Sequence, residues 1–159
     1  MSLITLDTPV TTIFSSQPKR VTWERTWAYA GGPFALHGWP ICNIHTDPEY
    51  ANSVGLSEPN VTGTQTQGYV IALLIDIFGE QWLTHGKLSD VKFIRLISIN
   101  ETIQIHAQVV SKEHDHTGVK YTLDIKCLKQ DGEIALVGQA VGWIVQETPE
   151  NTIIAGDKS

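Results

Sequence analysis

The apolar pattern is densest between Val70 and Phe78, where Asp76 is the one residue that is not apolar. This run is longer than a typical strand and shorter than the roughly 20 residues that span a membrane. A segment that is apolar almost all round is typical of a helix enclosed by other structure. The pattern predicts such a central helix over Gly63–Gly79, with Gly79 as its C-cap glycine. Asp76 is then expected to be buried, and to pair with a cation such as Arg95 or to lie at a subunit contact.

After this helix the apolar positions recur at every second residue, which is the period of a half-buried strand. Turns are marked by Asn100-Glu101, His116-Thr117-Gly118 and Gln130-Asp131-Gly132, and the last is a strong hairpin signal. Alternation of this kind suits an antiparallel sheet with one face on the core and its strands in hairpin order. Four long strands are predicted, at 87–99, 102–110, 119–127 and 133–145. The predicted fold class is therefore α+β, a long antiparallel sheet wrapped around the central apolar helix.

The segments that precede the central helix are shorter. Residues 1–20 are interpreted as a flexible arm or as an extension at a sheet edge. Residues 21–29 fit a strand or a short helix, and the spacing of Trp23 and Trp27 favours the helix. Residues 30–40 carry three glycines and two prolines and are predicted as a loop. Residues 80–86 are predicted as a connection.

A two-turn helix is predicted just after His45. Asp47 is a good N-cap, Pro48 suits the first helical position, and Glu49 suits the positive end of the helix dipole. Gly55 would end the helix. His45 is therefore expected to be held just before a helix cap.

The bulk properties point to a single domain. A chain of 159 residues, 42% hydrophobic and 18% charged, fits one domain over 1–159, with a core at about 20–145 and a tail at 146–159. The net charge of −6 argues against nucleic acid or an anionic membrane as the partner. Cys42 and Cys127 follow neither a metal-ligand spacing nor a disulfide framework. The start of the chain also lacks the basic region of a signal peptide. We therefore expect a cytoplasmic protein with reduced thiols. We expect no cofactor. We also expect no metal, because the triplet His114-Asp115-His116 lies at a turn where adjacent side chains rarely converge on one ion.

His45 is the strongest candidate for a catalytic group. Histidine side chains titrate near neutral pH, which suits proton transfer beside an apolar helix. The alternative is a ring that only bonds a loop carbonyl. Gly63 would offer its backbone N–H to a carbonyl oxygen at the start of the helix, or would serve only a tight turn. Asn43 lies next to the presumed site and would orient a water or hold a carbonyl.

Five further residues are candidates for the same site. Thr62, Thr64 and Thr66 would add hydroxyl donors for a substrate or would cap the central helix. His37, in the glycine-rich loop, would enter the pocket as a second proton carrier. Cys42 is a candidate nucleophile only through its position near His45.

The order of elements resembles the hotdog fold. More narrowly, Ile44–Ala51 (IHTDPEYA), followed by Gly63, the apolar helix and Val91–Arg95 (VKFIR), resembles the MaoC-like branch of that superfamily. The resemblance spans about residues 20–145. This branch contains the (R)-specific enoyl-CoA hydratases and related dehydratases, so the resemblance implies a hotdog fold and addition or removal of water at an acyl thioester. It also implies that His45 occupies the position of the catalytic histidine.

The sequence departs from the family pattern at two functional positions. The family motif is Asp-x-Asn-Pro-[Ile/Leu]-His, and its aspartate position is Pro40 here, with no carboxylate between Glu24 and Asp47. The His-Gly pair of the family, before the central helix, is Thr62-Gly63. The glycine N–H is therefore kept, and His45 must either move both protons or recruit help.

These observations predict a lyase of the hydratase/dehydratase type, acting on an acyl thioester or a related conjugated carbonyl compound. His45 would be the general acid/base and the Gly63 N–H the carbonyl donor. Two alternatives stay open: a non-catalytic hotdog subunit of a heteromer, or a diverged cyclase, isomerase or hydrolase with a non-CoA substrate. A single hotdog unit leaves sheet edges exposed and half a pocket, so we expect a homodimer or higher homo-oligomer with a shared site.

Overall fold

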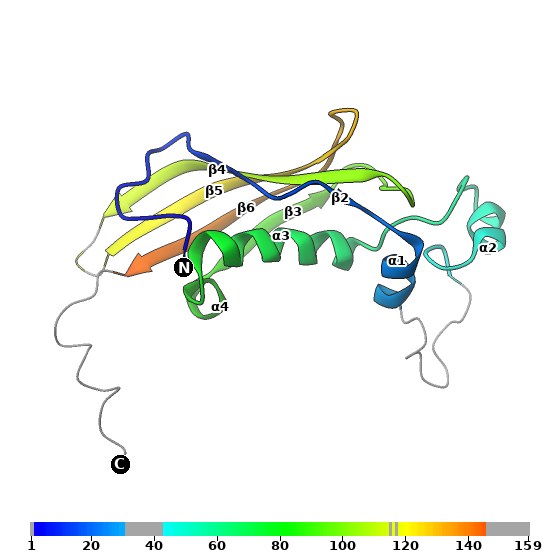
Figure 1. Ribbon diagram of the computed structural model, residues 1–159, viewed down its shortest axis with the longest axis horizontal. Coiled ribbons are helices and arrows are strands. Elements are labelled where there is room, and N and C mark those ends of the chain that lie inside the picture. Colours follow the sequence, from blue (N-terminus) through cyan, green and yellow to red (C-terminus); the bar gives the residue numbers. More distant parts are fainter. Residues whose placement is uncertain (1, 31–42, 115, 117, 146–159) are drawn as a thin grey trace, which may run out of the picture.

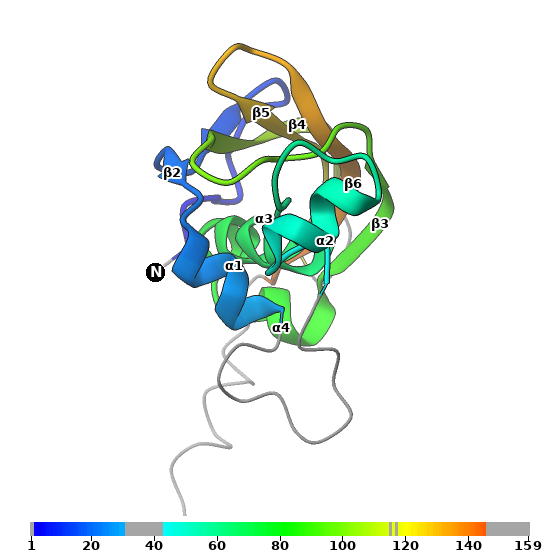
Figure 2. The ribbon, with the colours of Figure 1, turned by 90° about the vertical axis from the view of Figure 1, so that its right-hand side faces the viewer.

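The computed structural model describes residues 2–30, 43–114, 116 and 118–145. Within this part of the chain a six-stranded sheet curves around one long helix, α3 (Figures 1 and 2). Two short helices, α1 and α2, lie near the start of α3, and α4 follows its end. The elements in chain order are β1 (Ile13–Ser15), β2 (Lys19–Arg20), α1 (Trp23–Tyr29), α2 (Pro48–Ser53), α3 (Gly63–Phe78), α4 (Gln81–His85), β3 (Lys87–Phe93), β4 (Thr102–His114), β5 (Gly118–Lys129) and β6 (Ile134–Val145).

The sheet is antiparallel, in the order β1-β4-β5-β6-β3, and β2 also pairs with β4. The predicted hairpin order is correct for β4, β5 and β6 and wrong for β3, which pairs with β6 at the far edge. The strand predicted to reach Ile99 ends at Phe93. Residues 94–101 then cross beside the start of α3, where Val61 N–H donates to the Ile97 carbonyl at 2.8 Å. The turn at Asn100 therefore ends a crossover and does not close a hairpin.

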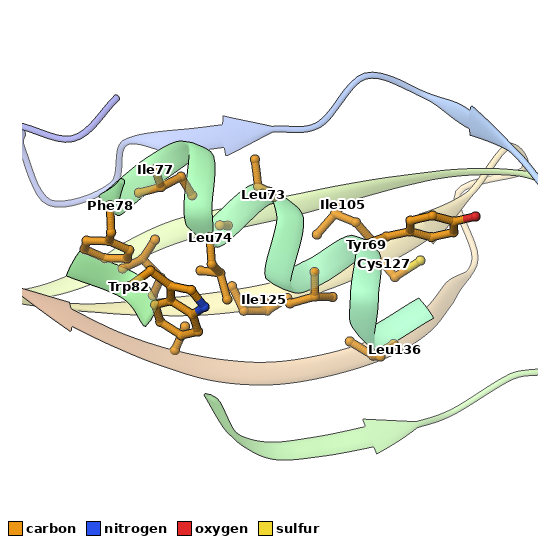
Figure 3. Packing of buried hydrophobic residues seen from close by; sticks show 14 of the residues in the cluster. Tyr69, Leu73, Leu74, Ile77, Phe78, Trp82, Ile105, Ile125, Cys127 and Leu136 are labelled. Atoms are coloured by element: carbon orange, nitrogen blue, oxygen red, sulfur yellow. The ribbon is translucent and has the colours of Figure 1, made fainter. Parts of the chain in front are cut away.

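The predicted central helix is confirmed, and it lies on the concave face of the sheet (Figure 2). Its buried side chains meet those of the central strands in one core cluster (Figure 3). The side chains at this contact include Tyr69, Leu73, Leu74, Ile77, Phe78, Ile105, Ile125 and Leu136.

The helix is not enclosed all round, because Ala72 and Asp76 lie on its exposed side. The prediction of a buried Asp76 is wrong: at 3.6 residues per turn, positions 72 and 76 face away from the sheet. Arg95 is also not its partner, because the Arg95 Nε pairs with the Glu133 carboxylate at 3.4 Å.

The N-terminal segment is held against the sheet and the helix, so the expectation of a flexible arm at residues 1–20 is wrong over the described 2–20. Strand β1 extends the sheet beside β4, which was the alternative expectation. The side chain of Ile4 is 1% exposed, and its N–H donates to the Ile77 carbonyl at 3.1 Å. The buried Tyr121 hydroxyl donates to the Thr5 carbonyl at 2.8 Å.

The local capping predictions are confirmed at both helices that flank the site. Asp47 caps α2, and its Oδ1 accepts from Tyr50 N–H at 3.0 Å. Gly79 ends α3 with a φ of 68°, in the left-handed region that favours glycine. The predicted connection at 80–86 instead contains α4. Within the described residues, no helix has the length and apolar character needed to cross a membrane.

Candidate active site

A cavity of about 550 Å³ lies at the start of α3. It is bounded by the end of α1, the loop before α2, the first turn of α3 and the end of β3. A smaller hollow of about 300 Å³ lies over β3, β5 and β6, but none of the predicted site residues lines it. The larger cavity is lined by Tyr29, Ala30, Asn43, His45, Thr62, Gly63, Thr64, Gln67 and Phe93.

His45 is fixed at both its backbone and its ring. Its N–H donates to the Asn43 Oδ1 at 2.8 Å, and its ring Nδ1 lies 2.7 Å from the Asn60 carbonyl oxygen. Because a carbonyl only accepts, Nδ1 must carry the hydrogen in this contact, and in the neutral ring Nε2 is left with a lone pair. The ring therefore bonds a loop carbonyl on one side and keeps a basic nitrogen on the other.

The start of α3 offers two backbone donors to the cavity. Thr62 is the N-cap, and its hydroxyl oxygen accepts from Gln65 N–H at 3.1 Å. Within the described residues, the N–H groups of Gly63 and Thr64 have no acceptor. Helix starts leave such donors unpaired, and the aligned peptide dipoles add partial positive charge there. This end of the cavity is suited to an oxygen that gains negative charge.

Two aromatic side chains lie against glycines of α3. A Cβ on Gly63 would lie 3.0 Å from the ring of Phe93, and a Cβ on Gly68 would lie 3.1 Å from the hydroxyl of Tyr29. The two aromatic residues are 54% and 50% exposed. Sequence reasoning missed both as site residues. The only signals in the sequence were Gly63 and Gly68, two glycines in the first turns of a helix whose other residues are larger.

Most of the predicted site residues meet in this cavity. His45, Asn43, Thr62 and Gly63 all line it. The side-chain oxygen of Asn43, Oδ1, accepts the hydrogen bond from the His45 N–H. The side-chain NH₂ group of Asn43 is therefore the part that can face a ligand.

Other predicted residues are placed elsewhere. Thr66 does not line the cavity: it is 2% exposed, and its hydroxyl donates to the Thr62 carbonyl at 3.4 Å, because position 66 faces the sheet. His37, Pro40 and Cys42 lie outside the described residues. In the described part of the chain, no carboxylate lines the cavity and no group of three or more His, Cys, Asp or Glu side chains could hold a metal ion.

Comparison with known proteins identifies the family and the fold of the chain. Residues 16–129 match the family model described as MaoC like domain. Among curated proteins, no sequence matches this chain. The fold is similar to that of an (R)-hydratase from A. caviae involved in PHA biosynthesis, with a TM-score of 0.68, 20% identity, and 87% of this chain and 98% of that chain covered.

Two further solved structures show the same likeness. One is a MaoC-like dehydratase from Rhodospirillum rubrum, with a TM-score of 0.68 and 17% identity, covering 89% of this chain and 96% of that one. The other is the ChsH1-ChsH2 complex from Mycobacterium tuberculosis, with a TM-score of 0.66 and 12% identity, covering 86% and 98%. At these identities the likeness shows the fold, and the predicted hotdog fold is confirmed.

Proposed function

The chain belongs to the MaoC-like domain family, and from this premise we propose that it is a lyase of the hydratase/dehydratase type. Its substrate would be an acyl thioester or a related conjugated carbonyl compound. The observation that carries the proposal is that His45, whose Nε2 is the ring nitrogen left with a lone pair, and Gly63, whose N–H has no acceptor among the described residues, line one cavity. Water addition beside a carbonyl needs these two functions, a base and an oxyanion donor.

The proposed reaction starts with the substrate carbonyl oxygen at the N–H of Gly63. His45 Nε2 takes a proton from water, the water oxygen bonds to Cβ, and the electron pair of the double bond moves toward the carbonyl oxygen. The Gly63 and Thr64 N–H groups would stabilise the negative charge there. The imidazolium then returns its proton to Cα, which regenerates the base. His45 thus performs both proton transfers, and the Asn60 carbonyl stabilises the imidazolium through Nδ1–H.

Asn43 and Thr62 have supporting roles in this proposal. The Asn43 NH₂ would hold the water or the hydroxyl group of the product, in the place of the absent carboxylate. Thr62 would keep the helix start capped, so that the Gly63 and Thr64 N–H groups stay directed at the carbonyl.

The test uses a panel of enoyl-CoA thioesters of increasing chain length, with the loss of conjugated-thioester absorbance as the readout. We expect turnover by the wild type and a loss of at least about 100-fold in kcat for His45→Ala, the scale of general acid–base catalysis. His85→Ala is the matched control, because His85 is exposed on α4, away from the cavity. Absence of turnover at every chain length, or full turnover by His45→Ala, would remove the proposal.

A non-catalytic subunit of a heteromer is the second candidate function. The observation that favours it is the absence of a carboxylate among the described residues of the cavity. The similar ChsH1-ChsH2 structure is a complex of two different proteins. If this candidate is correct, the purified chain alone is inactive and gains activity only with a partner that supplies the acid.

We further propose that the chain forms a homodimer with its sites at the interface. Strand β3 has no neighbour on its outer side in the described sheet, and edges of this kind pair readily with a second chain. Large apolar side chains are exposed where this edge meets the cavity: Phe93 at 54%, Ile94 at 54% and Leu96 at 59%. A second copy over this edge would bury them and close the mouth of the cavity.

A further inference from the structure

The Asn60 carbonyl that holds the His45 ring is itself fixed by the chain around it. Asn60 is 4% exposed, its N–H donates to the Ile44 carbonyl at 3.2 Å, and its side-chain Nδ2 donates to the Glu58 carbonyl at 3.1 Å. Asn60 also forms an isolated antiparallel bridge with Ser98. The orientation of the ring therefore depends on the segment that contains Ser98.

This segment is the crossover at residues 94–101, and it also holds the chain just before α3. Val61 N–H donates to the Ile97 carbonyl at 2.8 Å, and the two residues are buried, at 8% and 5% exposed. Val61 is followed directly by the N-cap Thr62 and by Gly63. A shift of the crossover would therefore disturb both sides of the candidate active site.

One carboxylate ties the crossover to the sheet. Glu101 Oε2 accepts from Ser98 N–H at 2.8 Å, and Glu101 Oε1 pairs with Lys129 Nζ at 2.7 Å. The side chains of Glu101 and Lys129 are 19% and 12% exposed, and Lys129 lies on the central strand β5. Lys129 Nζ also lies 3.5 Å from the Glu133 carboxylate. Because an ion pair shielded from solvent is screened less by salt than an exposed one, this pair can hold the crossover in one position.

We propose that Glu101, held by Lys129, is a positioning residue for the candidate active site. It fixes the crossover, and the crossover fixes the Asn60 carbonyl that selects the Nδ1–H tautomer of His45. The inference rests on the proposed function, since that reaction uses Nε2 as the base. Neither Glu101 nor Lys129 lines the cavity, so both act on the reaction only through the residues that they hold in place. A misplacement of about 1 Å in a reacting group can cost about 100-fold in rate.

The first readout is the tautomer of His45, from the nitrogen NMR shifts of its ring at about pH 8.5, where an ordinary histidine is neutral. His45→Ala assigns the signals by their loss. We expect the Nδ1–H form alone in the wild type and a mixture of both tautomers in Glu101→Ala, which removes the acceptor of the Ser98 N–H and the partner of Lys129. Glu101→Gln keeps one oxygen for Ser98 and loses only the ion pair. It should shift the tautomers in the same direction by a smaller amount, and it decides the test if Glu101→Ala does not fold.

The second readout is the kinetics of the enoyl-CoA panel. The kcat of Glu101→Ala should fall by about 10-fold to 100-fold, with KM changed by less than about 2-fold, because the lost geometry matters in the transition state and not in substrate binding.

Two control variants separate positioning from a loss of stability. Glu113→Gln breaks the exposed ion pair with Lys120, whose atoms lie 3.1 Å apart and whose side chains are 60% and 35% exposed. Ile4→Ala removes a buried side chain at the far end of α3, where Ile4 N–H donates to the Ile77 carbonyl. Both controls should keep the wild-type tautomer and a kcat within about 2-fold of the wild type.

The wild-type tautomer in every Glu101 variant that folds, or a mixture of tautomers in the wild type, would overturn the inference. A mixture in Ile4→Ala as well would show a general loss of structure and would also overturn it. So would a mixture in Glu101→Ala with an unchanged kcat, since the tautomer would then have no role in the reaction. If the wild type turns over no thioester, the proposed reaction fails. A change of tautomer in Glu101→Ala, with none in the controls, would still support the positioning of His45.

Discussion

At the residue scale, Cys127 shows how burial sets reactivity. Its side chain is 0% exposed, and burial raises the pKa of the thiol from 9.0 to about 12. Since this pKa is raised in the folded state, the thiol causes no pH dependence of stability below about pH 9. Above that pH the free energy of unfolding falls by up to about 1.4 kcal/mol per pH unit toward pH 12. In Cys42→Ser, which leaves Cys127 as the only cysteine, a thiol reagent at pH 8 should label the protein only after unfolding. Rapid labelling of the folded variant would contradict this burial.

At the element scale, the end of α3 depends on the N-terminal segment. Leu3 and Ile4 N–H groups donate to the last carbonyls of the helix, at Asp76 and Ile77, which would otherwise lack partners. The Ile4 side chain is 1% exposed, whereas the adjacent Leu3 is 58% exposed. Ile4→Ala should therefore lower the free energy of unfolding by about 2–5 kcal/mol, and Leu3→Ala, the matched control, by less than about 0.5 kcal/mol, as measured by urea denaturation. A loss for Ile4→Ala as small as that for Leu3→Ala would mean that the packing of this segment does not stabilise the fold.

At the scale of the whole molecule, the β3 edge predicts the state of assembly. If a second copy covers this edge, light scattering should report twice the mass of one chain, 17.6 kDa. Ile94→Asp combined with Leu96→Asp places two charges in the interface and should give monomers. Ile13→Asp is the control, because Ile13 is a 58% exposed isoleucine on β1, at the opposite edge of the sheet from β3. A wild-type monomer at micromolar concentration would sink the shared-site proposal.

The sequence by itself determined the elements whose causes are local. The apolar run of α3, the Asp47 cap of α2 and the alternation in β4, β5 and β6 each depend on residues a few positions apart. The same local signals brought His45 and Gly63 forward as site residues. The Asp47 cap fixes the end of the loop that carries His45, and Gly63 is the first residue of α3.

Only the tertiary structure decided which distant residues meet. Strand β3 lies beside β6 because the chain crosses over after Phe93, and no local pattern encodes such a crossover. Tyr29 reaches the cavity from α1, some 40 positions away in the sequence from Gly68. The orientation of α3 on the sheet decides that Thr66 is buried and that Asp76 is exposed to solvent. These outcomes depend on long-range packing, in which many contacts act together to fix the position of each element.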